Sequence, residues 1–360
     1  MWKLPVLIAC LFSLTACSEM DYYLHSVTGH LEVLSKRQTI SSLLHNKSTP
    51  DELQQQLNQI SKVRDFASQR LQLPDNGSYR SYVDLDRPYV IWNVVATPEF
   101  SLEPLQWNFP VVGNVSYRGY FDRKKADQFA QSLSEKDFDV IITGVPAYST
   151  LNWFDDPVLS TFSDWPLPAV AKLIFHELAH QKLYIPDDTS FNESFATSVE
   201  QIGIEIWLQQ TNDPNMQRRY QRQIKRQRQF NNLLRTTRLA LETLYARDIP
   251  RQQMISEKQQ VFADMQQDYQ QLRDDWQGYS GYDGWFSQLN NARFAASDNY
   301  HRWVPAFLLA MEQEGHDLKH FYRRCETIAK LPEQQRHQLL DRMAAEKRQK
   351  QPSKGAKHEH

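Results

Sequence analysis

The sequence predicts an α+β fold that is mostly helical and carries a small sheet. Apolar residues recur at helical spacing over 22–70 and again over 167–182. Short runs of β-branched and aromatic residues, separated by Pro and Gly, occupy 79–115. Beyond Thr211 the chain is rich in Gln and Arg and has few helix breakers up to about Asp275, which favours long amphipathic helices.

The first residues predict export from the cytoplasm. A short basic start precedes an almost wholly apolar run over 4–16, which is too short to span a bilayer and is typical of a signal peptide. The run ends in Leu-Thr-Ala-Cys, with Cys17 last, and this resembles the bacterial lipobox, whose cysteine is lipidated and becomes the mature N-terminus. Ser18, in place of an Asp, then favours the outer membrane, facing the periplasm. The alternative is an ordinary signal peptide that contains a cysteine by chance.

The number of cysteines and the charge balance argue against a disulfide, a cysteine-based metal site and a nucleic-acid partner. Removal of Cys10 with the signal and lipidation of Cys17 leave Cys325 as the one free thiol, so we expect no internal disulfide and no cysteine-based metal site. The chain has 41 basic and 43 acidic residues, and a net field that would recruit nucleic acid is therefore absent. We interpret the basic run 215–228 as solvated helix surface and expect no nucleic-acid partner.

Helix breakers and turn residues separate the predicted elements. Two or three helices over 22–70 are separated by the breaker pair Thr49-Pro50, and periodicity and apolar density predict the elements that follow. These are strands over 89–95 and 107–115, a helix over 124–133, a buried strand over 138–144, a helix over 167–182 and a further helix beginning near Asn192. After a Gly-rich turn, core-like composition returns over 289–309.

A His-Glu-x-x-His pattern lies within the helix expected over 167–182, at His176, Glu177 and His180. Residues four apart share a helix face, with Cβ atoms about 5–6 Å apart, so both imidazoles can bind one zinc ion. Glu177 then points toward the water on the metal and acts as general base, and it passes the proton to the leaving amine. The alternative is a surface helix that carries two histidines by chance.

A catalytic zinc site needs a third protein ligand and an open fourth position. Glu193 is the best candidate, because it lies thirteen residues after His180 and at the start of the next helix, which can return against the first. We expect Glu200, two turns further, to support the site from outside the ligand set. The candidates that could replace Glu193 are Glu200, Glu205, Asp187 and Asp188.

Several stretches resemble the bacterial putative aminopeptidase family, predicted zinc lipoproteins of proteobacteria. They are 22–24 with Gly29, 144–150 continuing into 153–157, 176–180, 192–196 and 290–293. The resemblance covers nearly the whole chain up to the C-terminal tail. It implies a zincin-like fold of the gluzincin type, with Glu193 as third zinc ligand and peptides as substrates.

Other residues carry weaker predictions. The segment 144–150 follows a buried strand and could be an edge along which a peptide lies, or a structural turn. Tyr148 or Tyr300 could stabilise the oxyanion, although packing is the alternative for each. Asn291 and Arg293 could bind a substrate terminus or tie loops together.

The leading interpretation is a zinc metallopeptidase, anchored by lipid to the outer membrane and acting on short peptides from their amino end. A non-catalytic envelope lipoprotein with structural zinc and partner-binding helices is the alternative, and a third reading is an endopeptidase for misfolded envelope proteins. The glutamate between the histidines favours catalysis. The expected divisions are a signal peptide (1–16), a zinc peptidase core (17–210), a helical extension (211–276), a C-terminal part of the core (277–345) and a disordered tail (346–360).

Overall fold

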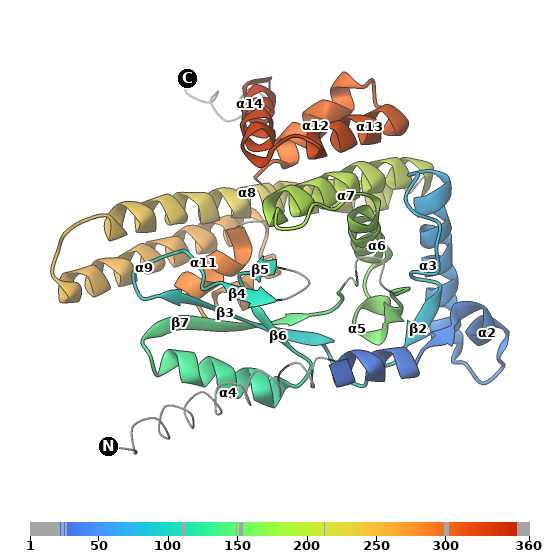
Figure 1. Cartoon of the computed structure of the whole chain (residues 1–360), viewed down its shortest axis with the longest axis horizontal. Helices are drawn as coiled ribbons and strands as arrows, with labels where there is room; N and C mark the ends of the chain where they lie inside the picture. The colour runs from blue at the N-terminus through green and yellow to red at the C-terminus, as the bar shows by residue number, and fades with distance from the viewer. Residues whose placement is uncertain are drawn as a thin grey trace, which may run out of the picture.

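The computed structural model describes residues 22, 25, 27–109, 113–148, 150, 154–211, 213–298 and 302–350. The predicted lipidation site Cys17 and the candidate Tyr300 lie outside these residues. Most described residues are helical, and the strands form small sheets (Figure 1). Within the described ranges, no helix is both long enough and apolar enough to cross a membrane.

The N-terminal half contains both strands and helices, beginning with a helix over 27–35. The elements that follow are β1 (Gln38–Thr39), α2 (Ile40–His45), α3 (Asp51–Gln69), β2 (Ser81–Val83), β3 (Ile91–Pro98), β4 (Trp107–Phe109), β5 (Gly113–Val115), β6 (Arg118–Tyr120), α4 (Arg123–Ser134), β7 (Phe138–Val145) and β8 (Val158–Leu159). In β1-β2-β8, β2 pairs antiparallel with β1 and parallel with β8. Strands β4 and β5 form a separate antiparallel pair.

The regular elements in the described part of the C-terminal half are all helices. Its elements are α5 (Ser160–Ser163), α6 (Leu167–Lys182), α7 (Thr189–Thr211), α8 (Pro214–Tyr245), α9 (Arg251–Asp275), α10 (Asp283–Phe286), α11 (Asn291–Asp298), α12 (Val304–Gln313), α13 (Leu318–Ala329) and α14 (Glu333–Lys350). Helix α6 spans the same residues as the helix expected from the sequence, whereas α7 begins three residues before Asn192. Helix α14 continues to Lys350, so residues 346–350 are helical and the prediction of a disordered tail from 346 was wrong for them.

The antiparallel sheet β6-β3-β7 is covered by helices on both faces. Val94 of β3, which pairs with Ile142 of β7, packs with Ala126 of α4. The next residue, Val95, packs with Ala292 of α11. Because successive strand side chains point to opposite faces, α4 and α11 lie on opposite sides of this sheet, as Figure 1 shows.

The long helices α8 and α9 pack on one another as a hairpin (Figure 1). Asp213 caps α8 by accepting hydrogen bonds from two backbone N–H groups of its first turn, and this satisfies donors that a helix start otherwise leaves unpaired. The hairpin is tied to the sheet, since Lys258 of α9 lies 2.7 Å from Asp139 of β7. The helical extension expected over 211–276 is thus attached to the sheet through α9.

The largest hydrophobic core surrounds α6 and α7. Helix α3 packs against α6, and α12 packs against α7 and α14. Two adjacent rows of α6 are buried, and they comprise Val170, Ile174 and Leu178 together with Ala171, Phe175 and Ala179. These rows follow the i, i+4 spacing of a helix face. The two helices that carry the candidate ligands are therefore fixed by apolar packing.

Candidate metal centre

Helix α6 brings the two histidines of the His-Glu-x-x-His pattern together. His176 and His180 lie one turn apart, and their Nε2 atoms are 3.2 Å from each other. The side chain of His180 is 7% exposed, while that of His176 is 19% exposed. Two imidazole nitrogens thus converge on one point that remains partly accessible from solvent.

Helix α7 supplies the third group from the facing side. The Glu193 carboxylate lies 3.3 Å from Nε2 of His176 and 3.6 Å from Nε2 of His180. The contacts between the helices pair Lys172 with Glu200 and His180 with Glu193, so α6 and α7 run antiparallel. In this arrangement the start of α7 lies beside the end of α6, which carries the second histidine.

The spacing of these atoms fits a tetrahedral metal ion. Zinc bonds of about 2.0–2.1 Å to nitrogen or carboxylate oxygen, at tetrahedral angles, separate neighbouring ligand atoms by about 3.3 Å. The two Nε2 atoms are 3.2 Å apart, and Glu193 presents Oε2 at 3.3 Å to His176 and Oε1 at 3.6 Å to His180. One ligand atom from each of the three residues lies within 4.8 Å of the others, which makes them a group of metal-binding type. Two imidazoles and one carboxylate leave the fourth position open for water or substrate, as a catalytic site requires.

A second carboxylate lies behind His176. Oε2 of Glu200 is 3.3 Å from Nδ1 of His176, the ring nitrogen on the far side from Glu193. Oε1 of Glu200 is 2.8 Å from Nζ of Lys172, which lies one turn before His176 on α6. A carboxylate on the outer nitrogen fixes ring orientation and favours a free Nε2 for a metal. Glu200 thus lies beside His176 on the side away from Glu193, and its supporting role stays a prediction.

Burial and neighbouring charges set the protonation of the group. Burial lowers the pKa of His180 to about 4, which keeps this imidazole neutral and able to bind a metal. Burial also lowers the pKa of His176, but contacts with Glu193 and Glu200 outweigh it, and the pKa stands well above the ordinary value. Burial raises the pKa of Glu177 to about 7, against the opposing effect of His176.

The structure separates the remaining carboxylate candidates from the histidines. Asp188 is buried in an ion pair with Arg336 at 2.6 Å and contacts His337 at 2.9 Å. Asp187 is exposed in the loop before α7. Glu205 lies twelve residues after Glu193 on α7, which corresponds to about 18 Å along the helix axis. Among the described residues, the metal-binding group contains none of these three.

Two residues with weaker predictions have structural partners. The hydroxyl of Tyr148 is 2.6 Å from Nδ1 of His30, and its role at the oxyanion stays a prediction. Asn291 is fully buried, accepts a hydrogen bond from the Tyr245 hydroxyl at 2.7 Å and donates one to the carbonyl of Glu99 at 2.9 Å. These contacts agree with the second of the two roles considered for Asn291, which was to tie loops together.

Sequence reasoning did not identify several residues beside the metal group. Lys172 lies four residues before His176, and Tyr184 lies four residues after His180, with its ring centre 6.4 Å from the His180 ring. Gln181 contacts Asp156, which is far away in the sequence. The i, i+4 spacing from a histidine was the one available signal, and it applied to Lys172, which lies on α6 with His176. Tyr184 lies just beyond the end of α6.

A cavity lies in another part of the molecule, away from the metal group. Its volume is about 580 Å³, and the residues that line it include Glu32, Arg87, Trp92 and Arg123. Neither histidine nor Glu193 lines it.

Comparison with known proteins adds one match. A family model described as "Putative aminopeptidase" matches residues 21–340. No curated protein and no solved structure shows significant similarity to the chain. The matched range includes α6, α7 and all residues of the metal group.

Proposed function

The chain belongs to the family described as "Putative aminopeptidase", and from this membership we propose that it is a zinc-dependent metallopeptidase. His176, His180 and Glu193 hold the metal in this proposal, and Glu177 is the general base. The observation that carries the proposal is the convergence of two Nε2 atoms and a carboxylate, with a glutamate next to the first histidine. We propose zinc because two imidazoles and one carboxylate match its catalytic ligand sets.

Each residue of the group has a separate task in hydrolysis. A bound zinc ion would act as a Lewis acid and lower the pKa of water in the site. Glu177 accepts a proton from the water that attacks the peptide carbonyl and returns it to the leaving amine. Glu200, whose carboxylate is 3.3 Å from Nδ1 of His176, orients this ring in the proposal, and Lys172 pairs with Glu200 at 2.8 Å. The large core keeps both helices in place throughout the reaction.

The finer parts of the proposal concern fold type, substrate and location. The two antiparallel helices with ligands at His176, His180 and Glu193 are consistent with a zincin-like core of the gluzincin type. Aminopeptidase action on short peptides follows from the family description alone. The lipobox-like sequence ending at Cys17 supports a lipid anchor in the outer membrane of a bacterial envelope.

A non-catalytic lipoprotein with structural zinc is the second candidate function. The long hairpin of α8 and α9 favours it, because polar helices of this length offer a large surface to a partner. Glu177 argues against it, since a structural site has no need of a carboxylate beside its ligands.

Zinc content and peptide hydrolysis test the proposal together. We expect about one zinc per chain in the wild type and in Glu177→Gln, with hydrolysis in the wild type alone. Glu205→Gln, an exposed glutamate on α7, is the matched control and should retain full activity. Cleavage of free-amino peptides but not of N-blocked ones indicates an aminopeptidase, and cleavage of blocked peptides indicates an endopeptidase. Absence of zinc from the wild type would overturn the proposal.

A further inference from the structure

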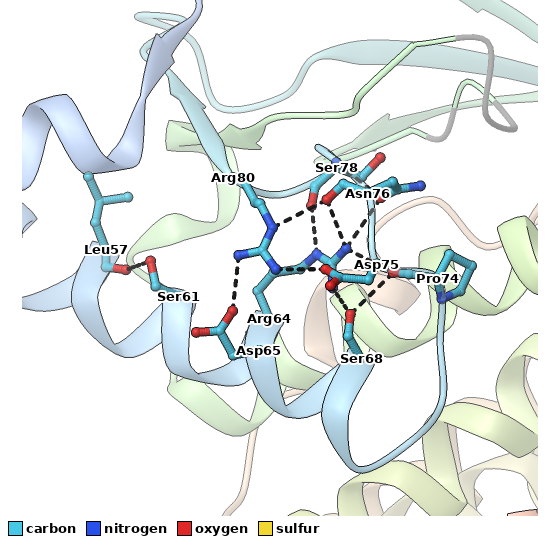
Figure 2. A network of polar contacts seen from close by, with 10 residues as sticks. All are labelled: Leu57, Ser61, Arg64, Asp65, Ser68, Pro74, Asp75, Asn76, Ser78 and Arg80. Atoms are coloured by element: carbon cyan, nitrogen blue, oxygen red, sulfur yellow. Dashed lines mark hydrogen bonds and ion pairs between the residues drawn. The ribbon is translucent and has the colours of Figure 1, made fainter.

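The turn over residues 74–78 is organised by one buried cation. Arg64 of α3 is fully buried, and its guanidinium donates hydrogen bonds to the carbonyl oxygens of Ser78 at 2.7 Å, Pro74 at 2.9 Å and Asn76 at 3.1 Å (Figure 2). It also donates to Oγ of Ser68 at 2.5 Å. Because the planar guanidinium has donors in fixed directions, these contacts hold the turn in one conformation.

The same turn contacts the active-site helix. Gln181 of α6 donates a hydrogen bond to Oγ of Ser78 at 3.1 Å and accepts one from the side chain of Asn76 at 2.8 Å. Gln181 lies four residues after Glu177, and residues four apart share a helix face. Glu177 therefore lies on the same face of α6 as Gln181, one turn closer to the start of the helix. Asn76 and Ser78 of the turn lie along that face of α6, and Tyr79 directly follows the turn in the chain.

Tyr79 follows the turn in an unusual backbone conformation. Its φ is +62°, which a bulky side chain rarely adopts. Its N–H donates a hydrogen bond to the carbonyl of Asp156 at 2.6 Å, and this contact helps to fix the conformation. The residue is 1% exposed. Such backbone strain persists only where the surroundings over-determine it, as the Arg64 contacts do here.

The hydroxyl of Tyr79 is buried and has no hydrogen-bond partner among the described residues. Leaving a buried hydroxyl unpaired is unfavourable, so its retention calls for a reason. Burial raises the pKa of Tyr79, and the charges of Glu177 and Asp156 raise it further, which keeps the hydroxyl protonated as a donor. The Asp156 carboxylate already accepts hydrogen bonds from Thr150 and Gln181. Glu177 is the other acidic neighbour.

We propose that Tyr79 is a positioning residue for Glu177, and that its hydroxyl donates a hydrogen bond to the Glu177 carboxylate in the metal-loaded, substrate-bound enzyme. Hydrogen bonds of this kind tighten only when the reacting complex forms. The bond holds the carboxylate at the angle needed for proton transfer and leaves metal binding to the two histidines and Glu193. This inference rests on the proposed function and assigns to it a residue from another part of the chain.

Tyr79→Phe tests the inference, with Tyr322→Phe as matched control. Tyr322 lies on α13, outside the metal group, and is also buried. Unlike the Tyr79 hydroxyl, its hydroxyl has a partner, since it donates a hydrogen bond to the carbonyl of Leu71 at 2.9 Å. For Tyr79→Phe we expect kcat to fall about ten- to a hundredfold, the range for a lost hydrogen bond to a charged group, with KM within about twofold of wild type. Its zinc content and the melting temperature of its metal-free form should not fall, because the deleted hydroxyl has no partner in the fold. For Tyr322→Phe we expect the reverse, a lower melting temperature and an unchanged kcat.

The outcomes separate this inference from the proposed function. An active wild type with an equally active Tyr79→Phe variant overturns the inference and leaves the proposed function standing. A lower melting temperature of Tyr79→Phe with unchanged kcat also overturns it, since the hydroxyl would then serve the fold. Loss of zinc from this variant overturns it as well, because the effect would act through the metal. A zinc-loaded wild type that cleaves no peptide overturns both.

Discussion

Three glutamates on α7 stand in different relations to the pair of imidazoles. Glu193 approaches both Nε2 atoms, at 3.3 and 3.6 Å. Glu200 approaches Nδ1 of His176 from the opposite side and is itself held by Lys172. Glu205 is exposed further along the helix. One helix thus carries, in the proposed function, a metal ligand, a supporting group and a glutamate with no part in the site.

Substitution of each glutamate by glutamine should therefore have graded effects on zinc affinity. Glu193→Gln removes the anionic ligand and should leave far less than one zinc per chain after dialysis. Glu200→Gln should weaken affinity about 10- to 100-fold, as is usual for groups that orient a ligand. Glu205→Gln should bind zinc like the wild type. Competition titration with a chromogenic chelator measures all three, and a larger loss from Glu200→Gln than from Glu193→Gln would contradict the ligand assignment.

At the scale of elements, the site depends on how closely α7 approaches α6. Gly203 of α7 makes this approach possible, because a Cβ added there would lie 2.7 Å from Cδ1 of Leu71 and 2.9 Å from Cδ2 of Phe175. Phe175 is fully buried and directly precedes His176. Displacement of Phe175 would consequently move the first histidine.

Gly203→Ala should destabilise the protein although alanine is the better helix former. The intrinsic gain of about 1 kcal/mol is outweighed by overpacking, which typically costs about 1–3 kcal/mol. Gly284→Ala is the control, because a Cβ at Gly284 of α10 meets nothing within 4 Å. Urea denaturation of both variants measures the difference. If the free energy of unfolding of Gly203→Ala were at least as high as that of Gly284→Ala, the prediction would be wrong, because α6 and α7 could then move apart at no cost in stability.

At the scale of the whole molecule, the metal group lies on helices that are already fixed by the largest hydrophobic core. Helices α3 and α12 pack against α6 and α7 from regions of the chain distant in sequence. A metal bound between α6 and α7 would add to this packing without replacing it. In small zinc domains that lack such a core, the metal itself drives folding.

Removal of zinc should lower the melting temperature without unfolding the protein. A ligand at a thousandfold excess over its Kd stabilises the native state by about 4 kcal/mol, which corresponds to a shift on the order of 10 °C. Calorimetry with and without a chelator measures the shift, and far-UV circular dichroism checks that the helices remain. Loss of helical signal on chelation at 25 °C would contradict this expectation and favour the structural role of zinc.

Much of the local structure could be predicted from spacing. The bounds of α6 and the position of both histidines on one of its faces follow from a period of 3.6 residues, which depends only on neighbouring residues. The start of α7 was expected three residues too late, and the end of α14 was missed, because helix ends depend on tertiary contacts as well as on local pattern.

The sequence by itself determined that two imidazoles and a glutamate share one helix, and that a carboxylate follows on the next helix. Only the tertiary structure decided that Glu193 faces both histidine Nε2 atoms, that Glu200 lies beside Nδ1 of His176, and that Asp187, Asp188 and Glu205 do neither. It also placed Gln181 in contact with Ser78, which lies 103 residues away in the chain and directly before Tyr79. The physical reason is that periodicity is a property of a single segment, whereas the facing of two segments is set by how their apolar surfaces pack.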